Sequence, residues 1–415
     1  MTHTAELLIW AISLASIACM LLRPLQIAEA YWACGGAVIL VVTRLIPSSA
    51  ARHAVREGWN VYLFLAGMMI LAELARQEGV FDYLAGVAAT HARNSAARLF
   101  LLVYVVGVIV TALLSNDATA VVLTPAVLAV VRRANVDSKP YLLACALIAN
   151  AASFVLPISN PANLVVYASK MPPLAEWLRI FALPSLASIV VTYICLRWIS
   201  RGSLREGVSG HAEPAHLTPE GRSAFAGLVF AAAGLVAASA FGLPLGPPAC
   251  VVAVIAMLLV ALRDRTVAVR VALGVSWSVL PFVAGLFVIV EALQSAGLLR
   301  AGIAALDSLS RIPATAAKFV AAFAVAVVSN GMNNLPVALA TGAAVRHAGE
   351  STALAHALLL GVDIGPNLAV SGSLATILWL IALRRENVEI TAWEFFKVGL
   401  ITMPLALAAS IALVR

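Results

Sequence analysis

Four polar motifs interrupt long apolar stretches of this sequence and carry most of the side chains able to bind a small polar molecule. Asparagine, serine and threonine supply hydrogen-bond donors and acceptors without net charge. Single polar residues inside apolar helices more often join neighbouring helices, but the motifs occur in the same order in both halves of the chain, which favours a binding site. The candidate binding residues are Ser115, Asn116 and Thr119; Ser159, Asn160 and Asn163; Ser329, Asn330, Asn333 and Asn334; and Gly372, Ser373 and Thr376.

Two aspartates lie deepest in apolar sequence, Asp117 in the first motif and Asp363 at the start of the fourth, which runs from Asp363 to Thr376. A carboxylate in an apolar environment is costly and takes up a proton more readily than in water. Both residues are therefore candidates for proton coupling. Glu73 and Glu291 are weaker candidates, because each lies within two turns of the end of its helix and Arg76 can pair with Glu73 across one helical turn.

Proline and glycine predict that two of the motifs lie at breaks in helices. Pro157 and Pro161 lie in or beside the second motif, and Gly365, Pro366 and Gly372 lie within the fourth. Such breaks free backbone carbonyls and amides that, inside a membrane, only a protein-lined or wet cavity can satisfy. Broken helices of this type bind ions through carbonyls and polar substrates through helix N-termini.

The composition requires lipid around most of the chain. Of its 415 residues, 62% are hydrophobic and 11% are charged, and the mean hydropathy is +0.98. A membrane span needs about 20 apolar residues, so roughly ten spans fit. The net charge of +7 is scattered over short loops, so we expect no nucleic-acid partner. The cysteines lack metal-ligand spacing and no GxxxxGK(S/T) loop is present, so we expect no metal, no cofactor and no ATP site.

The predicted fold is an all-α polytopic membrane protein with a scaffold and a transport bundle. We predict ten spans, at 5–22, 28–46, 59–77, 140–169, 175–199, 223–241, 247–263, 275–297, 353–383 and 394–413. Two further stretches, 97–133 and 316–346, each have two apolar arms, each short for a full crossing, around a polar centre. We predict that these are re-entrant helical hairpins, and that 140–169 and 353–383 are broken helices.

Two inverted repeats are predicted, at 1–199 and 223–415, joined by a polar cytoplasmic linker at 200–222. The sequence GWNVYLFLAGMMILAELARQEG at 58–79 matches SWSVLPFVAGLFVIVEALQSAG at 276–297. Five crossings per half is an odd number, so the second half inserts upside down. With both termini outside, most of the 27 Lys and Arg residues lie on the cytoplasmic side, as the positive-inside rule requires.

The motifs resemble those of the arsenite and antimonite efflux permeases in the ion transporter superfamily, over residues 58–380. The resemblance is carried by Asn116-Asp117, by Ser159-Asn160 with Asn163, by Asn333-Asn334-Leu335-Pro336 and by Gly372-Ser373-Leu374-Ala375-Thr376. It implies an inner-membrane transporter, not an enzyme, that exports trivalent arsenic or antimony hydroxide in exchange for protons and confers metalloid resistance. In some members a soluble arsenite-stimulated ATPase subunit assists, so such a subunit is an expected partner.

The uncharged motifs agree with a neutral trihydroxide substrate. A dicarboxylate would be repelled by Asp117, and none of the motifs contains Lys or Arg to offset this. A sodium/proton antiporter on the same fold stays open, with Asp117 and Asp363 exchanging Na⁺ for H⁺. An intramembrane aspartyl protease using the same two aspartates is disfavoured, because the repeated asparagine motifs have no role in proteolysis.

Overall fold

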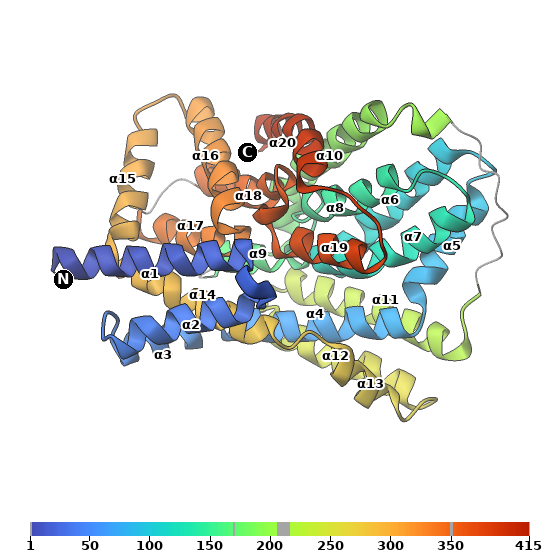
Figure 1. Ribbon diagram of the computed structural model, residues 1–415, viewed down its shortest axis with the longest axis horizontal. Coiled ribbons are helices and arrows are strands. Elements are labelled where there is room, and N and C mark those ends of the chain that lie inside the picture. The colour runs from blue at the N-terminus through green and yellow to red at the C-terminus, as the bar shows by residue number, and fades with distance from the viewer. Residues whose placement is uncertain (1, 169–170, 206–215, 349–351, 415) are drawn as a thin grey trace.

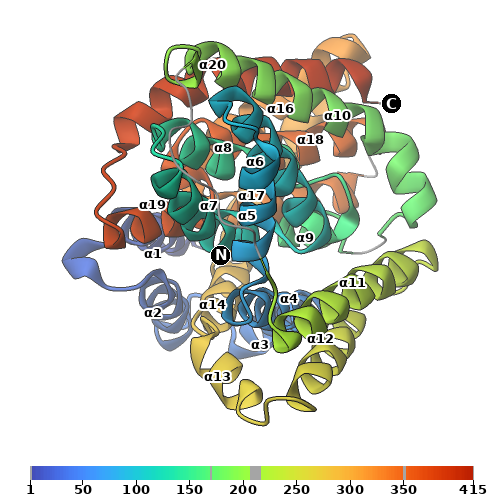
Figure 2. The same ribbon diagram turned by 90° about the vertical axis from the view of Figure 1, so that its right-hand side faces the viewer.

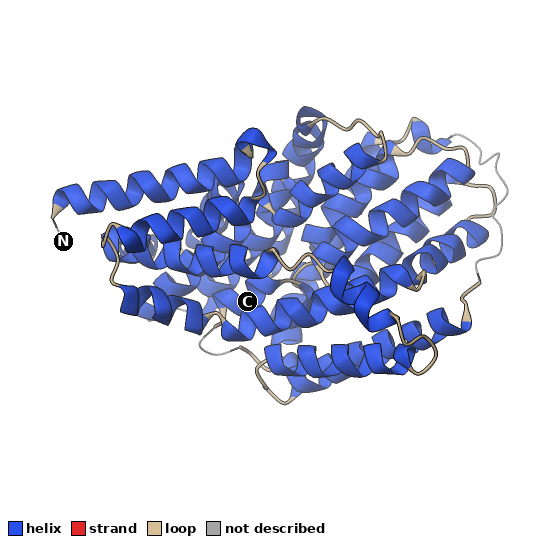
Figure 3. Ribbon diagram, turned by 60° about the horizontal axis from the view of Figure 1, so that its bottom comes forward, coloured by secondary structure: helices blue, strands red, loops and turns tan. Residues whose placement is uncertain are grey.

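A computed structural model describes residues 2–168, 171–205, 216–348 and 352–414 (Figure 1). Every regular element in these ranges is a helix, and Figure 3 shows the helices joined by short loops. Apolar helices satisfy their own backbone hydrogen bonds, which is the condition for a chain that crosses lipid. The all-α fold predicted from composition is confirmed.

Eight helical stretches among the described residues are long and apolar enough to cross a membrane. They are α1 (His3–Leu22), α4 (Trp59–Gln77), α6 (Ala96–Leu113), α10 (Leu174–Ile199), α11 (Pro219–Ala240), the stretch Val267–Leu309, α16 (Ala314–Met332) and α20 (Ala392–Leu413). The apolar helices α2 (Glu29–Val42) and α12 (Gly246–Ala261) are shorter. The ten predicted spans coincide with helices named above or with two pairs of short helices, which lie within the predicted broken helices 140–169 and 353–383. The chain is therefore a multi-pass membrane protein.

The remaining helices follow the same order in both halves. After two apolar helices, each half has a short helix, a long helix, a connecting helix, a hairpin, a broken helix and a final long helix. In the first half these are α3 (Ser48–Glu57), α4, α5 (Val80–His91), α6 with α7 (Thr124–Arg133), α8 (Lys139–Ala151) with α9 (Pro161–Val166), and α10. In the second half they are α13 (Val267–Gly274), α14 (Val279–Leu293), α15 (Leu299–Leu309), α16 with α17 (Asn334–Ala348), α18 (Thr352–Ile364) with α19 (Leu374–Arg385), and α20.

The two halves pack in reciprocal pairs. Helix α2 packs against α14 while α12 packs against α4, and α6 packs against α8 while α16 packs against α18. Figures 1 and 2 show two layers, one formed by α2 to α4 with α11 to α14 and the other by the hairpins, the broken helices, α10 and α20. Reciprocal packing is what two related halves produce, and inversion of the second repeat stays a prediction.

The first arm of each hairpin is longer than predicted. Helices α6 and α16 have 18 and 19 residues, which at 1.5 Å per residue reach about 27 to 29 Å, close to the thickness of the hydrocarbon core. Helix α7 has only 10 residues and follows a π-helical turn at Ala118–Leu123. The polar tip ends the first arm because Ser115 and Asn116 bond to backbone amides next to them.

The linker is shorter than the predicted 200–222. Residues 206–215 of this stretch lie outside the described residues. Helix α11 already begins at Pro219, because the Thr218 hydroxyl accepts a hydrogen bond from Gly221 N at 3.0 Å and caps the helix.

Candidate functional site

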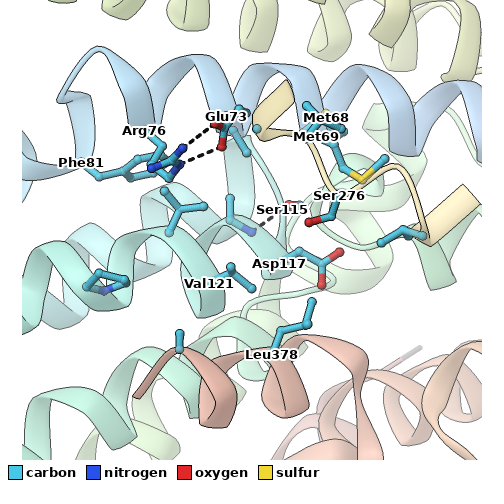
Figure 4. Close-up of a pocket in the computed structure, with 18 of the residues that line it drawn as sticks. Met68, Met69, Glu73, Arg76, Phe81, Ser115, Asp117, Val121, Ser276 and Leu378 are labelled. Atoms are coloured by element: carbon cyan, nitrogen blue, oxygen red, sulfur yellow. Dashed lines mark hydrogen bonds and ion pairs between the residues drawn. The ribbon is translucent and has the colours of Figure 1, made fainter. Parts of the chain in front are cut away.

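A cavity of about 670 Å³ lies between α4, the first hairpin, one side of α19 and the loop that joins α13 to α14 (Figure 4). This volume is typical of sites for small molecules. Most of the wall is apolar. The polar and charged residues that line it are Glu73, Arg76, Asp82, Ser115, Asp117, Ser276, Arg385 and Glu386.

Asp117 lies at the tip of the first hairpin, with its carboxyl group in the cavity wall. Ser115 shapes this tip, because its hydroxyl accepts a hydrogen bond from Ala118 N at 3.2 Å. Figure 4 shows the Ser276 hydroxyl, from the opposite layer, facing the carboxyl group of Asp117. Within the described part of the chain this carboxyl group has no hydrogen-bond or ion-pair partner. It is therefore available to a proton or a substrate.

Glu73 also lines the cavity, but its carboxylate is fully engaged. Arg76 donates from Nε and Nη2 to the two carboxylate oxygens at 2.7 and 2.5 Å, and Gln77 donates a third hydrogen bond at 2.6 Å. A Cβ at Gly274 of α13 would collide with this carboxylate. Glu73, predicted as a coupling residue, is placed as the counter-charge of Arg76.

The other charged residues of the wall are predominantly acidic. Burial raises the pKa of Asp82 in α5, and the Arg133 guanidinium partly opposes this rise. Glu386 pairs with Arg132 at 3.3 Å. Counting Arg76 and Arg385 against the carboxylates, two cationic and four anionic side chains line the cavity.

The predicted binding residues of the second motif stabilise the break between α8 and α9. The Asn160 side chain accepts a hydrogen bond from Ala162 N at 3.0 Å and so caps α9. Asn163 donates to the carbonyl of Ser153 at 2.9 Å, and Ser159 donates to that of Ala112 at 3.0 Å. None of the three predicted residues lines the cavity, which this break reaches through Pro161.

The fourth motif plays the same part before α19. The Ser373 hydroxyl accepts a hydrogen bond from Ala375 N at 3.2 Å, and Thr376 donates to Val370 O at 2.8 Å. A Cβ at Gly372 would lie 2.6 Å from the Asn330 side chain. This break contributes Leu374 to the cavity wall.

The remaining hairpin residues are buried or held by the backbone. Thr119 shares a 2.8 Å hydrogen bond with Thr111 of the other arm, while Asn116, Ser329 and Asn334 are buried outside the cavity. Asn330 donates to Gly365 O at 2.9 Å and accepts from Ala369 N at 2.9 Å, which joins the second hairpin to the second break.

Asn333 lines a separate pocket of about 10 Å³ with Glu29, Phe282 and Leu286. Its backbone φ of 73° is in the region that asparagine tolerates better than most residues.

The two other predicted coupling acids lie away from the cavity. Asp363 is completely buried and accepts a hydrogen bond from Asn160 Nδ2 at 2.7 Å. Glu291 of α14 is partly exposed outside the cavity lining. Within the described ranges, no three His, Cys, Asp or Glu side chains are grouped as a metal site would require.

Several lining residues escaped the sequence interpretation. Ser276 occupies the repeat position of Gly58, and Met68 and Met69 occupy those of Leu286 and Phe287. These positions could have been found in the sequence, because they carry different residue types in the two repeats and so mark places where the two halves differ in chemistry.

Residues 8–365 match the family described as CitMHS, citrate transporter. The arsenical pump membrane protein of Escherichia coli (strain K12) is 26% identical over 421 residues, which cover 98% of each chain. The arsenical pump membrane protein of Yersinia enterocolitica is 27% identical over 86% of each chain, and the uncharacterized transporter Rv2684 of Mycobacterium tuberculosis (strain ATCC 25618 / H37Rv) is 28% identical over 90% of each.

Among solved structures, the Alcanivorax borkumensis YdaH transporter, whose crystal structure is described as having an unusual topology, shares the fold. The TM-score is 0.57 at 16% identity, over 88% of this chain and 86% of that one. The predicted resemblance to arsenite efflux permeases is confirmed by the curated relatives. With its apolar helices and its family match over most of its length, the chain is a membrane transporter and belongs to the CitMHS citrate transporter family.

Proposed function

We propose that this protein is a secondary active transporter of the inner membrane that exports trivalent arsenic or antimony hydroxide in exchange for protons, without covalent chemistry. One observation carries the proposal: two arginines and four carboxylates line the cavity, and Arg76 is already paired with Glu73. A neutral trihydroxide needs hydrogen-bond donors and acceptors but no counter-charge. A polycarboxylate would meet an excess of negative charge.

The names of the relatives support this substrate. The Escherichia coli and Yersinia enterocolitica proteins are arsenical pump membrane proteins that match this chain over most of its length. The thioethers of Met68 and Met69 add polarisable sulfur to the cavity wall, which suits a soft metalloid. The family description names citrate, so citrate is the competing substrate in the test.

Asp117 is the proposed proton carrier. Its carboxyl group lines the cavity without a hydrogen-bond or ion-pair partner in the described residues, and it sits on the hairpin that is expected to move. An ionised carboxylate opposes closure of a dry cavity, whereas a protonated one does not. Protonation from outside therefore favours the return step, and deprotonation in the cytoplasm resets the carrier, with at least one proton entering for each substrate exported.

The cavity is proposed to open towards the cytoplasm, with both termini outside. Arg76 and Arg385 lie at the ends of α4 and α19 that the positive-inside rule places in the cytoplasm.

The repeat supplies the counterpart of this cavity on the other side. Phe64 and Met68 of α4 line the open cavity, while Phe282 and Leu286, at the same repeat positions in α14, line the pocket of about 10 Å³. One side is thus open and its counterpart is closed. We propose that rocking of the transport bundle against the scaffold closes the open cavity and opens the closed pocket.

Accumulation of arsenite in energised everted vesicles, with and without an uncoupler, tests the proposal. We expect accumulation that needs no ATP, that the uncoupler abolishes and that excess citrate does not reduce. Accumulation of citrate in place of arsenite contradicts the substrate. Collapse of the pH gradient by Na⁺ without arsenite uptake identifies a sodium/proton antiporter instead. Added soluble arsenite-stimulated ATPase shows whether such a subunit is a partner.

A further inference from the structure

A second polar site lies outside the transport cavity, where the broken helix of the first half meets α18. It consists of Asn150, Ser153, Asn160, Asn163 and Asp363, which we call the amide–carboxyl cluster. Each of these side chains is at most 3% exposed, and none lines the cavity. Polar groups buried this deeply require hydrogen-bond partners. Each donor and acceptor atom of the cluster should therefore have a partner.

Short contacts connect the cluster. Asn160 donates to Asp363 Oδ1 at 2.7 Å, and Ser153 also contacts this carboxyl group. Ser153 is in turn bonded to both remaining members: its carbonyl accepts from Asn163 at 2.9 Å, and its hydroxyl donates to Asn150 O at 2.7 Å. Ser153 therefore contacts three of the other four members, and Asn160 joins the cluster through Asp363.

Three oxygen atoms in the cluster have no hydrogen-bond partner among the described residues. They are Asp363 Oδ2, Asn150 Oδ1 and Asn163 Oδ1. All three are acceptors, because the amide nitrogens of both asparagines are already used on Asn367, Ser153 and neighbouring carbonyls. Unpartnered buried acceptors of this kind are satisfied by a cation or by a proton.

The charge of the cluster sets the valence of the ligand. Asp363 is its single carboxylate, and it contains no Lys or Arg. A monovalent cation would make the site neutral, whereas a divalent ion would leave a buried excess charge.

Two titratable groups lie on the elements packed here, Tyr167 after α9 and His356 on α18, with ring centroids 6.4 Å apart. His356 is seven residues from Asp363, about 10 Å along the helix, and Tyr167 lies within electrostatic range of the Asp363 carboxyl group.

We propose that the amide–carboxyl cluster binds a monovalent cation, either Na⁺ or a proton on Asp363, that joins the broken helix of the first half to α18 of the second. The site is separate from the proposed arsenite and Asp117 chemistry. Its cation holds both halves of the transport bundle together, so that the bundle can move as one body.

Thermal unfolding of the purified full-length protein in detergent tests this proposal without any arsenite. The unfolding temperature is measured in NaCl and in choline chloride at equal ionic strength, from mildly acidic to mildly alkaline pH. If Na⁺ is the ligand, we expect a saturable rise in Tm with NaCl at alkaline pH. If a proton is the ligand, Na⁺ has no effect and Tm falls as pH rises, because deprotonation leaves a buried charge.

Variants decide between a bound cation and a merely structural cluster. Asp363→Asn removes the Na⁺ response, or lowers the pH response by the part that Asp363 contributes, while Asp117→Asn, in the cavity, keeps the contribution of Asp363. Asn150→Ala leaves the hydrogen bond between Asn160 and Asp363 in place, so it is the variant to measure if Asp363→Asn does not fold. If Na⁺ is the ligand, Asn150→Ala raises the Na⁺ concentration needed for half of the rise in Tm about tenfold. If a proton is the ligand, Asn150→Ala leaves the pH response of Tm unchanged. A wild-type Tm indifferent to both Na⁺ and pH, or an unchanged response in Asp363→Asn, overturns the proposal and leaves the arsenite proposal unaffected.

Discussion

Arg76 holds Glu73 in a two-pronged hydrogen bond, Nε to Oε2 at 2.7 Å and Nη2 to Oε1 at 2.5 Å. Because both oxygens are engaged, Glu73 is occupied as the counter-charge of Arg76. We expect Glu73→Gln to retain arsenite accumulation that is sensitive to an uncoupler, with kcat/KM lowered about threefold to tenfold, since Arg76 then faces the cavity without its counter-charge. Initial rates in everted vesicles measure this. Complete loss of coupling in a folded Glu73→Gln protein contradicts the assignment.

Asp117→Asn removes the carboxyl group at the hairpin tip that has no partner in the described residues. We expect the variant to fold and to exchange external for internal arsenite, because substrate binding needs no proton. Accumulation against a gradient should fall to the level seen with an uncoupler. The matched control is Asp307→Asn, an exposed aspartate of α15 outside the cavity. Full accumulation by Asp117→Asn assigns the proton to another residue.

Gly372→Ala tests the contact between the second hairpin and the second break. The added methyl group would lie 2.6 Å from both Asn330 Oδ1 and Pro366 Cα, so the break must shift. Overpacking of this kind costs about 1 to 3 kcal/mol, and we expect a Tm lowered by several degrees with weaker transport. Gly331→Ala, whose new methyl group meets nothing within 4 Å, is the control. Equal Tm values for the two variants count against a rigid joint at Asn330.

Asp82→Asn tests the effect of burial at the edge of the cavity. Burial raises the pKa of Asp82 above its ordinary value, so the folded state binds a proton more tightly than the unfolded state. Ionisation then destabilises the fold increasingly as pH rises through the interval between the two pKa values. We expect Asp82→Asn to raise Tm at neutral pH, with the gain vanishing below about pH 4. Asp307→Asn should change Tm equally little at both pH values. A gain that persists in acid refutes this explanation.

Glu29→Gln tests the closed side of the protein. Glu29 lies at the start of α2, almost buried in the small pocket beside Asn333, and forms an ion pair with Arg23. Loss of the charge leaves Arg23 unpaired and loosens the seal, so we expect faster labelling of Asn333→Cys by a hydrophilic thiol reagent in the purified protein. The five native cysteines are replaced beforehand. An unchanged labelling rate shows that the ion pair does not seal this side.

Composition and spacing alone determined that the chain spans a membrane and where its helices break. An apolar stretch of about 20 residues has no other stable place than lipid, and Pro157, Pro161 and Pro366 each remove a backbone hydrogen-bond donor from any helix that contains them. The repeated motifs at Asn116 and Asn330 also predicted equivalent hairpins. These are local properties, so they can be read from the sequence without knowledge of distant contacts.

The packing of helices that are distant in the sequence determines which polar residues face the cavity. Asn160 and Ser373 were predicted to bind substrate, but each caps the helix that follows its own break, because a free backbone amide lies nearer than the cavity. Ser276 was not predicted, because it faces Asp117 only once the two layers are packed together. A side chain that can bond either to local backbone or to a ligand is assigned by the packing of distant helices, which no local pattern encodes.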